Sequence, residues 1–162
     1  MPLIAAEGGH VDKFEGDGLM AVFGAPRPFP DHARRAVRVA LEIDRRINIE
    51  AEAGEFRLGV GINTGNVIAG SVGGGGRLNF SVIGDAVNVA ARVEAETRRT
   101  GDAILLTEAT RAKLGDELET ISRGERDLKG IDRPVTLHAP AGASRFDEGR
   151  LKLLRDTIRA VR

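Results

Sequence analysis

The chain has no cysteine, tryptophan or tyrosine among its 162 residues, and it has only six phenylalanines. Without cysteine it can form neither a disulfide framework nor a thiolate metal site. It also has no formal net charge, because 24 Lys and Arg residues balance 24 Asp and Glu residues. This balance excludes the strongly basic surface of a non-specific nucleic-acid binder, so we expect no nucleic-acid partner.

Long apolar runs are missing as well. No segment approaches the roughly 20 apolar residues that span a bilayer, so we expect no membrane segment. The first ten residues, MPLIAAEGGH, lack the basic and apolar regions of a secretory signal. Hydrophobic residues at 41% and charged residues at 30% are typical of a folded globular domain. Together these features predict a cytoplasmic location.

Glycine is in excess: there are 21, and ten of them lie within residues 54–84. Around Leu58, Val60 and Ile62, glycines occupy the alternate positions, which predicts a strand with one nearly bare face. Such a face lets either a ligand or another backbone come close, and the pattern alone does not choose between them. The run GGGGR at 73–77 lacks the Lys-Ser/Thr pair of a phosphate-binding Walker A loop and predicts a loop tip.

The remaining patterns predict an α+β fold over residues 1–141, followed by a tail or linker helix over 142–162. The expected elements, in chain order, are a hairpin over 8–23, a helix from the N-cap Asp31 to about 53, strands at 58–62 and 78–83, a helix over 85–98, a buried strand over 103–107, a short helix capped by Thr107, and a strand pair over 118–129 and 134–139.

Two places could carry chemistry. Asn88 and Arg92 are four residues apart and share one helix face, where they could meet an anionic, hydroxyl-bearing ligand. The same spacing also fits an ordinary solvated face. Asp17, in a tight hairpin turn, could hold a Mg²⁺ ion together with substrate phosphates, or could simply bond its own backbone. The three histidines show no ligand spacing.

Several segments taken together point to a known family. VDKFEGDGLMAVFGAP, GVGINTGNVIAGSVG and NFSVIGDAVNVAARVE occur in this order, and DLKGIDRPVTLHAP closes the series. Over residues 4–140 they resemble the catalytic domain of class III adenylate/guanylate cyclases. The resemblance implies a ferredoxin-like nucleotide cyclase sandwich with a mixed sheet. It also implies a phosphorus–oxygen lyase that converts ATP to 3′,5′-cyclic AMP and pyrophosphate at sites shared within a homodimer.

The resemblance also assigns roles to the substrate-binding residues. Lys13 matches the position that faces adenine N1, where guanylate cyclases usually have Glu, and Ser81 matches its base-reading partner. Together Lys13 and Ser81 favour ATP over GTP. Asn88 matches the residue that orients the ribose, and Arg92 the one that neutralises charge on the phosphates. Lys129 matches the lysine that grips the terminal phosphates.

The family uses two Mg²⁺ or Mn²⁺ ions held by two Asp residues, and Asp17 matches the second of these. The first lies on an opening strand in a Phe-x-Asp-Ile-x-Gly-Phe segment, and nothing in residues 1–10 resembles it. We therefore expect the opening strand to be missing and activity to be very low. Either the chain is an incomplete copy of a longer cyclase with further domains, or it is a short protein with altered packing. A non-catalytic dimerisation or nucleotide-binding regulatory module is the alternative function.

Overall fold

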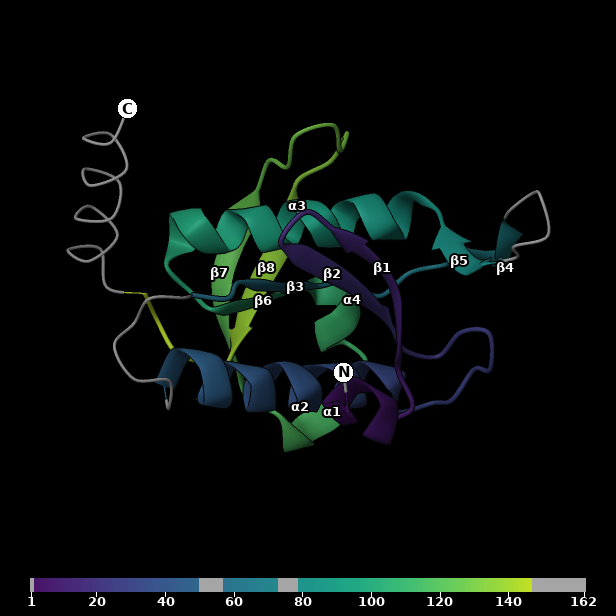
Figure 1. Cartoon of the computed structure of the whole chain (residues 1–162). Helices are drawn as coiled ribbons and strands as arrows, with labels where there is room; N and C mark the ends of the chain where they lie inside the picture. Colours follow the sequence, from purple (N-terminus) through teal and green to yellow (C-terminus); the bar gives the residue numbers. More distant parts are fainter. Residues whose placement is uncertain (1, 50–56, 73–78, 147–162) are drawn as a thin grey trace, which may run out of the picture.

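The computed structural model describes residues 2–49, 57–72 and 79–146, and a four-stranded mixed sheet lies at its centre (Figure 1). The sheet has the order β3–β6–β8–β7. Its strands are β3 (Val60–Ile62), β6 (Ile104–Thr107), β8 (Val135–Pro140) and β7 (Thr120–Arg126). β3 runs parallel to β6, whereas the β6–β8 and β8–β7 pairs are antiparallel. The expected α+β fold with a mixed sheet is confirmed.

Two long helices sandwich this sheet. Helix α3 (Asp85–Thr100) lies on one face and α2 (His32–Asp44) on the other (Figure 1). The buried strand β6 serves both faces, because successive side chains of a strand point to opposite sides. Leu105 packs with Val93 of α3, and Leu106 packs with Val37 of α2. The apolar run ILLT therefore sits where both layers of the core meet.

Gly61 of β3 and Gly59, which precedes the strand, lie directly under α3. A Cβ atom built on Gly61 would come within 2.6 Å of the Ala90 carbonyl oxygen and would also collide with the Glu94 backbone nitrogen. A Cβ on Gly59 would collide with the Thr97 hydroxyl. The bare strand face is thus filled by a helix backbone, which decides between the two alternatives that the sequence left open.

Two hairpins stand beside the central sheet. The first joins β1 (His10–Glu15) to β2 (Gly18–Val22), as expected, and a short helix α1 (Pro2–Ala6) precedes it. The second joins β4 (Ile68–Val72) to β5 (Asn79–Ile83). Neither α1 nor β4 is predicted from the sequence. Within the described ranges both hairpins form separate two-stranded sheets, and β3 pairs only with β6.

The helix ends give a mixed result. Thr107 caps the short helix α4 (Glu108–Arg111) as expected, because its side chain accepts a hydrogen bond from the Thr110 backbone N–H. The expected cap by Asp31 is wrong: no side-chain hydrogen bond caps α2 there, and the Asp31 carboxylate instead accepts from Arg35 Nε at 2.8 Å.

Beyond Asp44, the α2 helix continues as a π-helical turn, η1 (Arg45–Ile49). Its predicted end near residue 53 lies outside the described residues, as do the glycine tip at 73–76 and the tail helix. A short 3₁₀ helix, η3 (Gly115–Glu117), precedes β7. No helix in the described ranges is both long and apolar enough to cross a bilayer.

Residues 141–146 include a segment that runs antiparallel to residues 101–103, just before the start of β6. Ser144 accepts a backbone hydrogen bond from the Ala103 N–H at 3.0 Å, and the Phe146 N–H donates to the Gly101 carbonyl at 2.6 Å. The buried Asp44 carboxylate accepts from both the backbone N–H and the hydroxyl of Ser144. The described part of the segment 142–162 is therefore bound to the domain, while the boundary at residue 141 stays a prediction.

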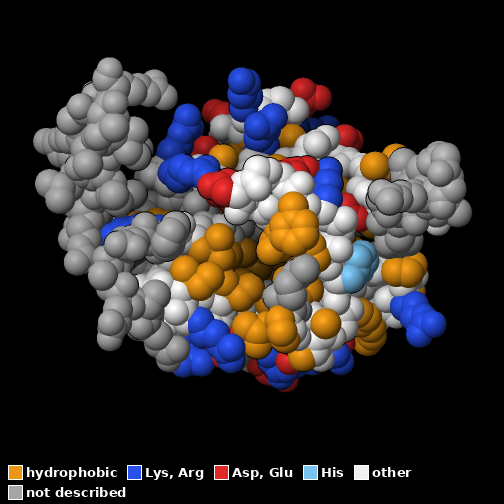
Figure 2. Space-filling view, in the orientation of Figure 1, with side chains coloured by type: hydrophobic (Ala, Val, Ile, Leu, Met, Phe, Trp, Pro, Cys, Tyr) orange, Lys and Arg blue, Asp and Glu red, His pale blue; other side chains and the backbone are white. Residues whose placement is uncertain are grey.

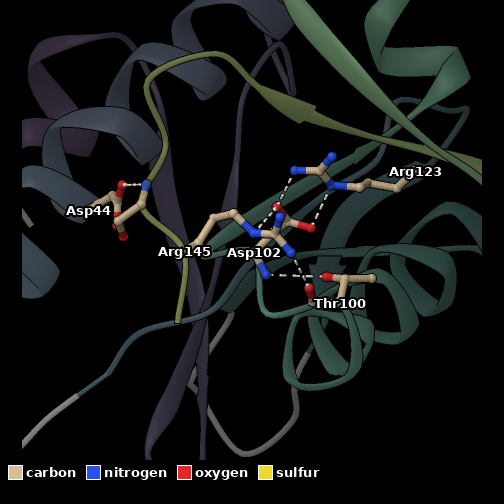
Figure 3. A network of polar contacts seen from close by, with 6 residues as sticks. Asp44, Thr100, Asp102, Arg123 and Arg145 are labelled. Carbon is tan, nitrogen blue, oxygen red and sulfur yellow. Dashed lines mark hydrogen bonds and ion pairs between the residues drawn. The ribbon is translucent and has the colours of Figure 1, made fainter. Parts of the chain in front are cut away.

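A second buried carboxylate reinforces the same corner (Figure 3). Asp102 is 1% exposed and accepts two hydrogen bonds from Arg123, from Nε at 2.8 Å and from Nη2 at 2.7 Å. Arg145 lies 3.6 Å from the same carboxylate and donates to the Thr100 carbonyl at 3.0 Å. Both buried acids at this end of the molecule are thus neutralised or hydrogen-bonded by neighbouring groups.

Candidate functional site

Strand β1 carries Lys13 next to an irregularity in its pairing. Val11 lies opposite Ala21 and Lys13 lies opposite Met20, so Asp12 is an extra residue that forms a β-bulge. A bulge breaks the strict alternation of a strand and re-aims its side chains. Asp12 and Lys13 are therefore not held to opposite faces of the hairpin.

The ammonium group of Lys13 is exposed and charged. Its Nζ atom lies 2.7 Å from a carboxylate oxygen of Glu15, two residues along the strand. The hydrogen bond with Glu15, together with the charges of Glu15 and Asp12, raises the pKa of Lys13 above its usual value. An ammonium has three N–H donors, so those that Glu15 does not use remain available to a ligand.

Ser81 lies on β5, opposite Gly70 of β4. Its hydroxyl donates a hydrogen bond of 3.0 Å to Oδ2 of Asp12, which lies 69 residues away in the chain. This bond joins β5 to β1, so the strands that carry Ser81 and Lys13 meet side by side. The two residues expected to read the purine therefore come from neighbouring strands.

Asn88 and Arg92 lie in the first half of α3, which begins two residues after β5 ends. Both side chains are exposed, while Val93 behind them is fully buried in the core. No residue in the described ranges gives either side chain a hydrogen bond or an ion pair. The pair is thus presented to solvent on a helix that the core holds firmly.

Asp17 and Lys129 stand apart from these four residues. Asp17 is exposed in the two-residue turn between β1 and β2, and Gly16 beside it takes a positive φ of 61°. Lys129 is exposed in the β7–β8 connection and follows Leu128, which is buried against α3. Within the described residues no hydrogen bond or ion pair links Asp17 or Lys129 to the other candidate residues.

The acidic residues do not amount to a complete metal site. No group of three or more His, Cys, Asp or Glu residues in the described part of the chain could hold a metal ion. Asp17 offers a single carboxylate, and Mg²⁺ is usually bound through one or two carboxylates plus substrate phosphates. The described residues therefore fit one carboxylate contact to a nucleotide-bound ion, but they do not fit a site for two ions.

Asp12 is the residue that the sequence analysis missed. Asp12 lies at the bulge and bonds Ser81, whereas strict alternation would have turned its side chain to the face opposite Lys13. The available signal was the spacing of the apolar residues Val11 and Phe14, which are three apart where an uninterrupted strand predicts two. An odd spacing of this kind indicates an extra residue in the strand.

A model of the adenylate and guanylate cyclase catalytic domain matches residues 3–139 of this chain. The chain belongs to the class III adenylate/guanylate cyclase family. Members of this family are nucleotide-binding lyases that synthesise cyclic nucleotides, they generally use two Mg²⁺ or Mn²⁺ ions, and they are typically dimeric.

The similar proteins do not share one nucleotide. An uncharacterised protein of Mycobacterium tuberculosis is 39% identical over 140 residues, which are 85% of this chain and 25% of that protein. The crystal structure of the guanylyl cyclase Cya2 matches with a TM-score of 0.76 and 30% identity, covering 88% of this chain and 75% of Cya2. The adenylyl cyclase CyaB from P. aeruginosa matches with a TM-score of 0.76 and 26% identity, covering 89% of this chain and 77% of CyaB.

The curated relatives are much longer than this chain. This cyclase domain spans a quarter or less of the curated relatives that it matches first. What the comparisons establish is the nucleotide cyclase family and its fold.

Proposed function

We propose that this cyclase domain binds ATP and converts it to 3′,5′-cyclic AMP and pyrophosphate. The observation that carries the proposal is the hydrogen bond that joins β1 to β5, because it brings the strand that carries Lys13 next to the strand that carries Ser81. Adenine presents an acceptor at N1 beside a donor at its amino group, and guanine presents the reverse. A lysine ammonium only donates, so Lys13 complements adenine N1 and opposes the guanine N–H.

The phosphate and ribose contacts are proposed for α3 and for the β7–β8 connection. Arg92 has no partner among the described residues, so its guanidinium is available for bidentate bonds to phosphate oxygens. Asn88, one helical turn earlier on the same face, can bond a ribose hydroxyl. Lys129 adds a second exposed cation for the terminal phosphates. Positive charge placed in this way stabilises the charge that develops on the phosphates as the 3′-hydroxyl attacks.

A second copy of the chain is part of the proposal. Large apolar side chains are exposed on both hairpins, namely Phe14, Leu19, Ile68 and Ile83. Figure 2 shows hydrophobic side chains gathered on the face that carries the β1–β2 hairpin. Exposed apolar surface of this kind marks interaction sites. A homodimer would cover it and would bring a second set of site residues to the interface.

The direct test is the incubation of the purified chain with ATP and Mn²⁺, followed by quantification of cyclic AMP. We expect slow but measurable formation, because Asp17 supplies only one of the carboxylates that a two-ion site needs. The variant Arg92→Ala should abolish the product. Arg98→Ala is the matched control, because Arg98 lies on the same helix and is engaged by Glu94. Equal product from both variants would contradict the assignment of Arg92.

A non-catalytic nucleotide-binding or dimerisation module is the second candidate. The observation that favours it is that the described part of the chain has no group of three or more His, Cys, Asp or Glu residues that could hold a metal ion. Calorimetry with an ATP analogue that cannot be cyclised separates the possibilities. Binding without turnover supports a regulatory module, and no binding at millimolar concentrations leaves only a dimerisation role.

A further inference from the structure

Asp12 differs from the buried carboxylates of Asp44 and Asp102. Its Oδ2 atom accepts the hydrogen bond from Ser81, while its Oδ1 atom is buried and has no hydrogen-bond partner among the described residues. Asp44 and Asp102, by contrast, have both oxygens bonded. A buried unsatisfied oxygen costs stability and calls for an explanation other than structural support.

The bond to Asp12 fixes what Ser81 can do. A serine hydroxyl has one proton and two lone pairs, and a free hydroxyl rotates to donate or to accept as its ligand requires. A carboxylate can only accept, so the single proton of Ser81 is committed to Asp12. The hydroxyl oxygen then offers only lone pairs to a ligand.

We propose that Asp12 is a specificity-determining positioning residue, which holds the Ser81 hydroxyl as an acceptor beside the Lys13 donor. This inference rests on the proposed function and deepens it. An acceptor beside a donor matches the amino group and N1 of adenine. Guanine would need Ser81 to donate to its carbonyl oxygen, which the bond to Asp12 prevents. The bond from Ser81 to Asp12 therefore disfavours guanine although Asp12 itself makes no contact with the base.

The bulge is what makes this arrangement possible. Without the extra residue, the side chains of Asp12 and Lys13 would alternate across the strand. With it, Asp12 reaches Ser81 on β5, and its charge also acts on the neighbouring Lys13. Asp12 thus bonds one base-reading group, Ser81, and acts on the other, Lys13, through its charge, and it needs no contact with the nucleotide.

The test measures the ratio of affinities for ATP and GTP analogues that cannot be cyclised, by calorimetry with Mg²⁺ on the full chain. Asp12→Asn is nearly isosteric, and its amide can donate to Ser81 and so frees the serine proton. We expect the ATP-over-GTP ratio to fall about fivefold to tenfold, the size of one hydrogen bond. Asp116→Asn, on the exposed η3 turn, is the control and should leave the ratio unchanged.

Two Ser81 variants keep the test decisive if Asp12→Asn fails to fold. Ser81→Ala should lower the ratio, whereas Ser81→Thr keeps the hydroxyl and should preserve it. In the Ser81→Ala background, Asp12→Asn should have no further effect on the ratio, because Asp12 acts through Ser81. A purely structural role would weaken both nucleotides equally.

The possible failures are distinguishable. If the unmodified chain binds ATP but Asp12→Asn leaves the ratio within about twofold, smaller than a typical hydrogen bond, the inference is overturned and the proposed function stands. Equal weakening of ATP and GTP binding overturns the inference as well. If the unmodified chain binds neither analogue at millimolar concentrations, the proposed function falls and the inference falls with it.

Discussion

The two ends of helix α3 treat polar side chains in opposite ways. Near its C-terminus, Thr97 is buried and bonds the Glu94 carbonyl, and the following Asp102 is buried and held by Arg123. Near its N-terminus, Asn88 and Arg92 are exposed and have no partner among the described residues.

The difference separates polar groups that hold the fold from those that are available to a ligand. A buried polar group must be satisfied, because an unpaired one costs about 1–3 kcal/mol and an unpaired charge costs more. An exposed group is satisfied by water and contributes little to stability. Substitutions of polar residues at the Asp102 end should therefore change the free energy of unfolding, and substitutions at the Arg92 end should change the affinity for a ligand.

The largest expected effect on stability comes from removing the buried ion pair at the C-terminal end of α3. Asp102→Ala leaves the Arg123 guanidinium, which is 21% exposed, without its carboxylate partner. Loss of one partner of a buried pair costs about 3–5 kcal/mol, so the free energy of unfolding in urea should fall by that amount. Asp116→Ala, at an exposed acid, is the control and should change it by less than about 0.5 kcal/mol. A small loss for Asp102→Ala would mean that water replaces Asp102 at this corner.

The middle of α3 can be tested through Gly61 of β3. Gly61→Ala places a methyl group against the Ala90 and Glu94 backbone, so α3 must move or the strand must shift. Overpacking of this kind costs about 1–3 kcal/mol, again measured by urea unfolding. Gly70→Ala is the matched strand control, because a Cβ there meets no atom within 4 Å. If the two variants proved equally stable, the close approach of α3 to β3 would be refuted.

At the exposed end, Arg92→Ala should leave unfolding almost unchanged, within about 0.5 kcal/mol. It should instead weaken the binding of an ATP analogue by about tenfold or more, the value of a charge-assisted hydrogen bond. Calorimetry and urea unfolding of the same preparation measure both quantities. Arg98→Ala serves as the control on the same helix. An Arg92→Ala variant that lost stability but kept its affinity would show that Arg92 supports the fold and does not bind the ligand.

Much of this fold was predictable because its signals are local. The run ILLT indicates a fully buried strand, and Thr107 followed by a helical segment indicates a cap; the structure confirms both. The hydrogen bonds that satisfy the buried Asp44 and Asp102 carboxylates were not predictable. Asp44 bonds Ser144 across 100 residues and Asp102 bonds Arg123 across 21, and no periodic pattern marks such partners. The acidic side chains alone gave no sign that they would be buried.

The candidate site also contains residues whose placement follows from the sequence and residues whose placement does not. Asn88 and Arg92 share a face because helical spacing requires it, and their placement follows from the sequence. The contact between Asp12 and Ser81 depends on a bulge and on two hairpins meeting, which spacing along the chain does not encode. The bare face of β3 was predictable, but only the packed structure shows that α3 fills it.

The smallest expected effect concerns a partly exposed acid outside both ends of α3. Glu42 accepts hydrogen bonds from Arg45 and Arg46, which lower its pKa from 4.5 to about 2. A carboxyl whose pKa is lowered by folding stabilises the fold above its unfolded pKa, and this contribution is lost as the pH falls from about 4.5 toward 2. Glu42→Gln should therefore flatten the stability profile slightly over that range and leave it unchanged in slope at neutral pH. The measurement is urea unfolding at a series of pH values, together with NMR titration of the carboxyl group. A Glu42 resonance that titrates near 4.5 would show that Arg45 and Arg46 do not stabilise the ionised carboxylate. Of the two kinds of ion pair, only the buried Asp102 pair would then contribute to stability.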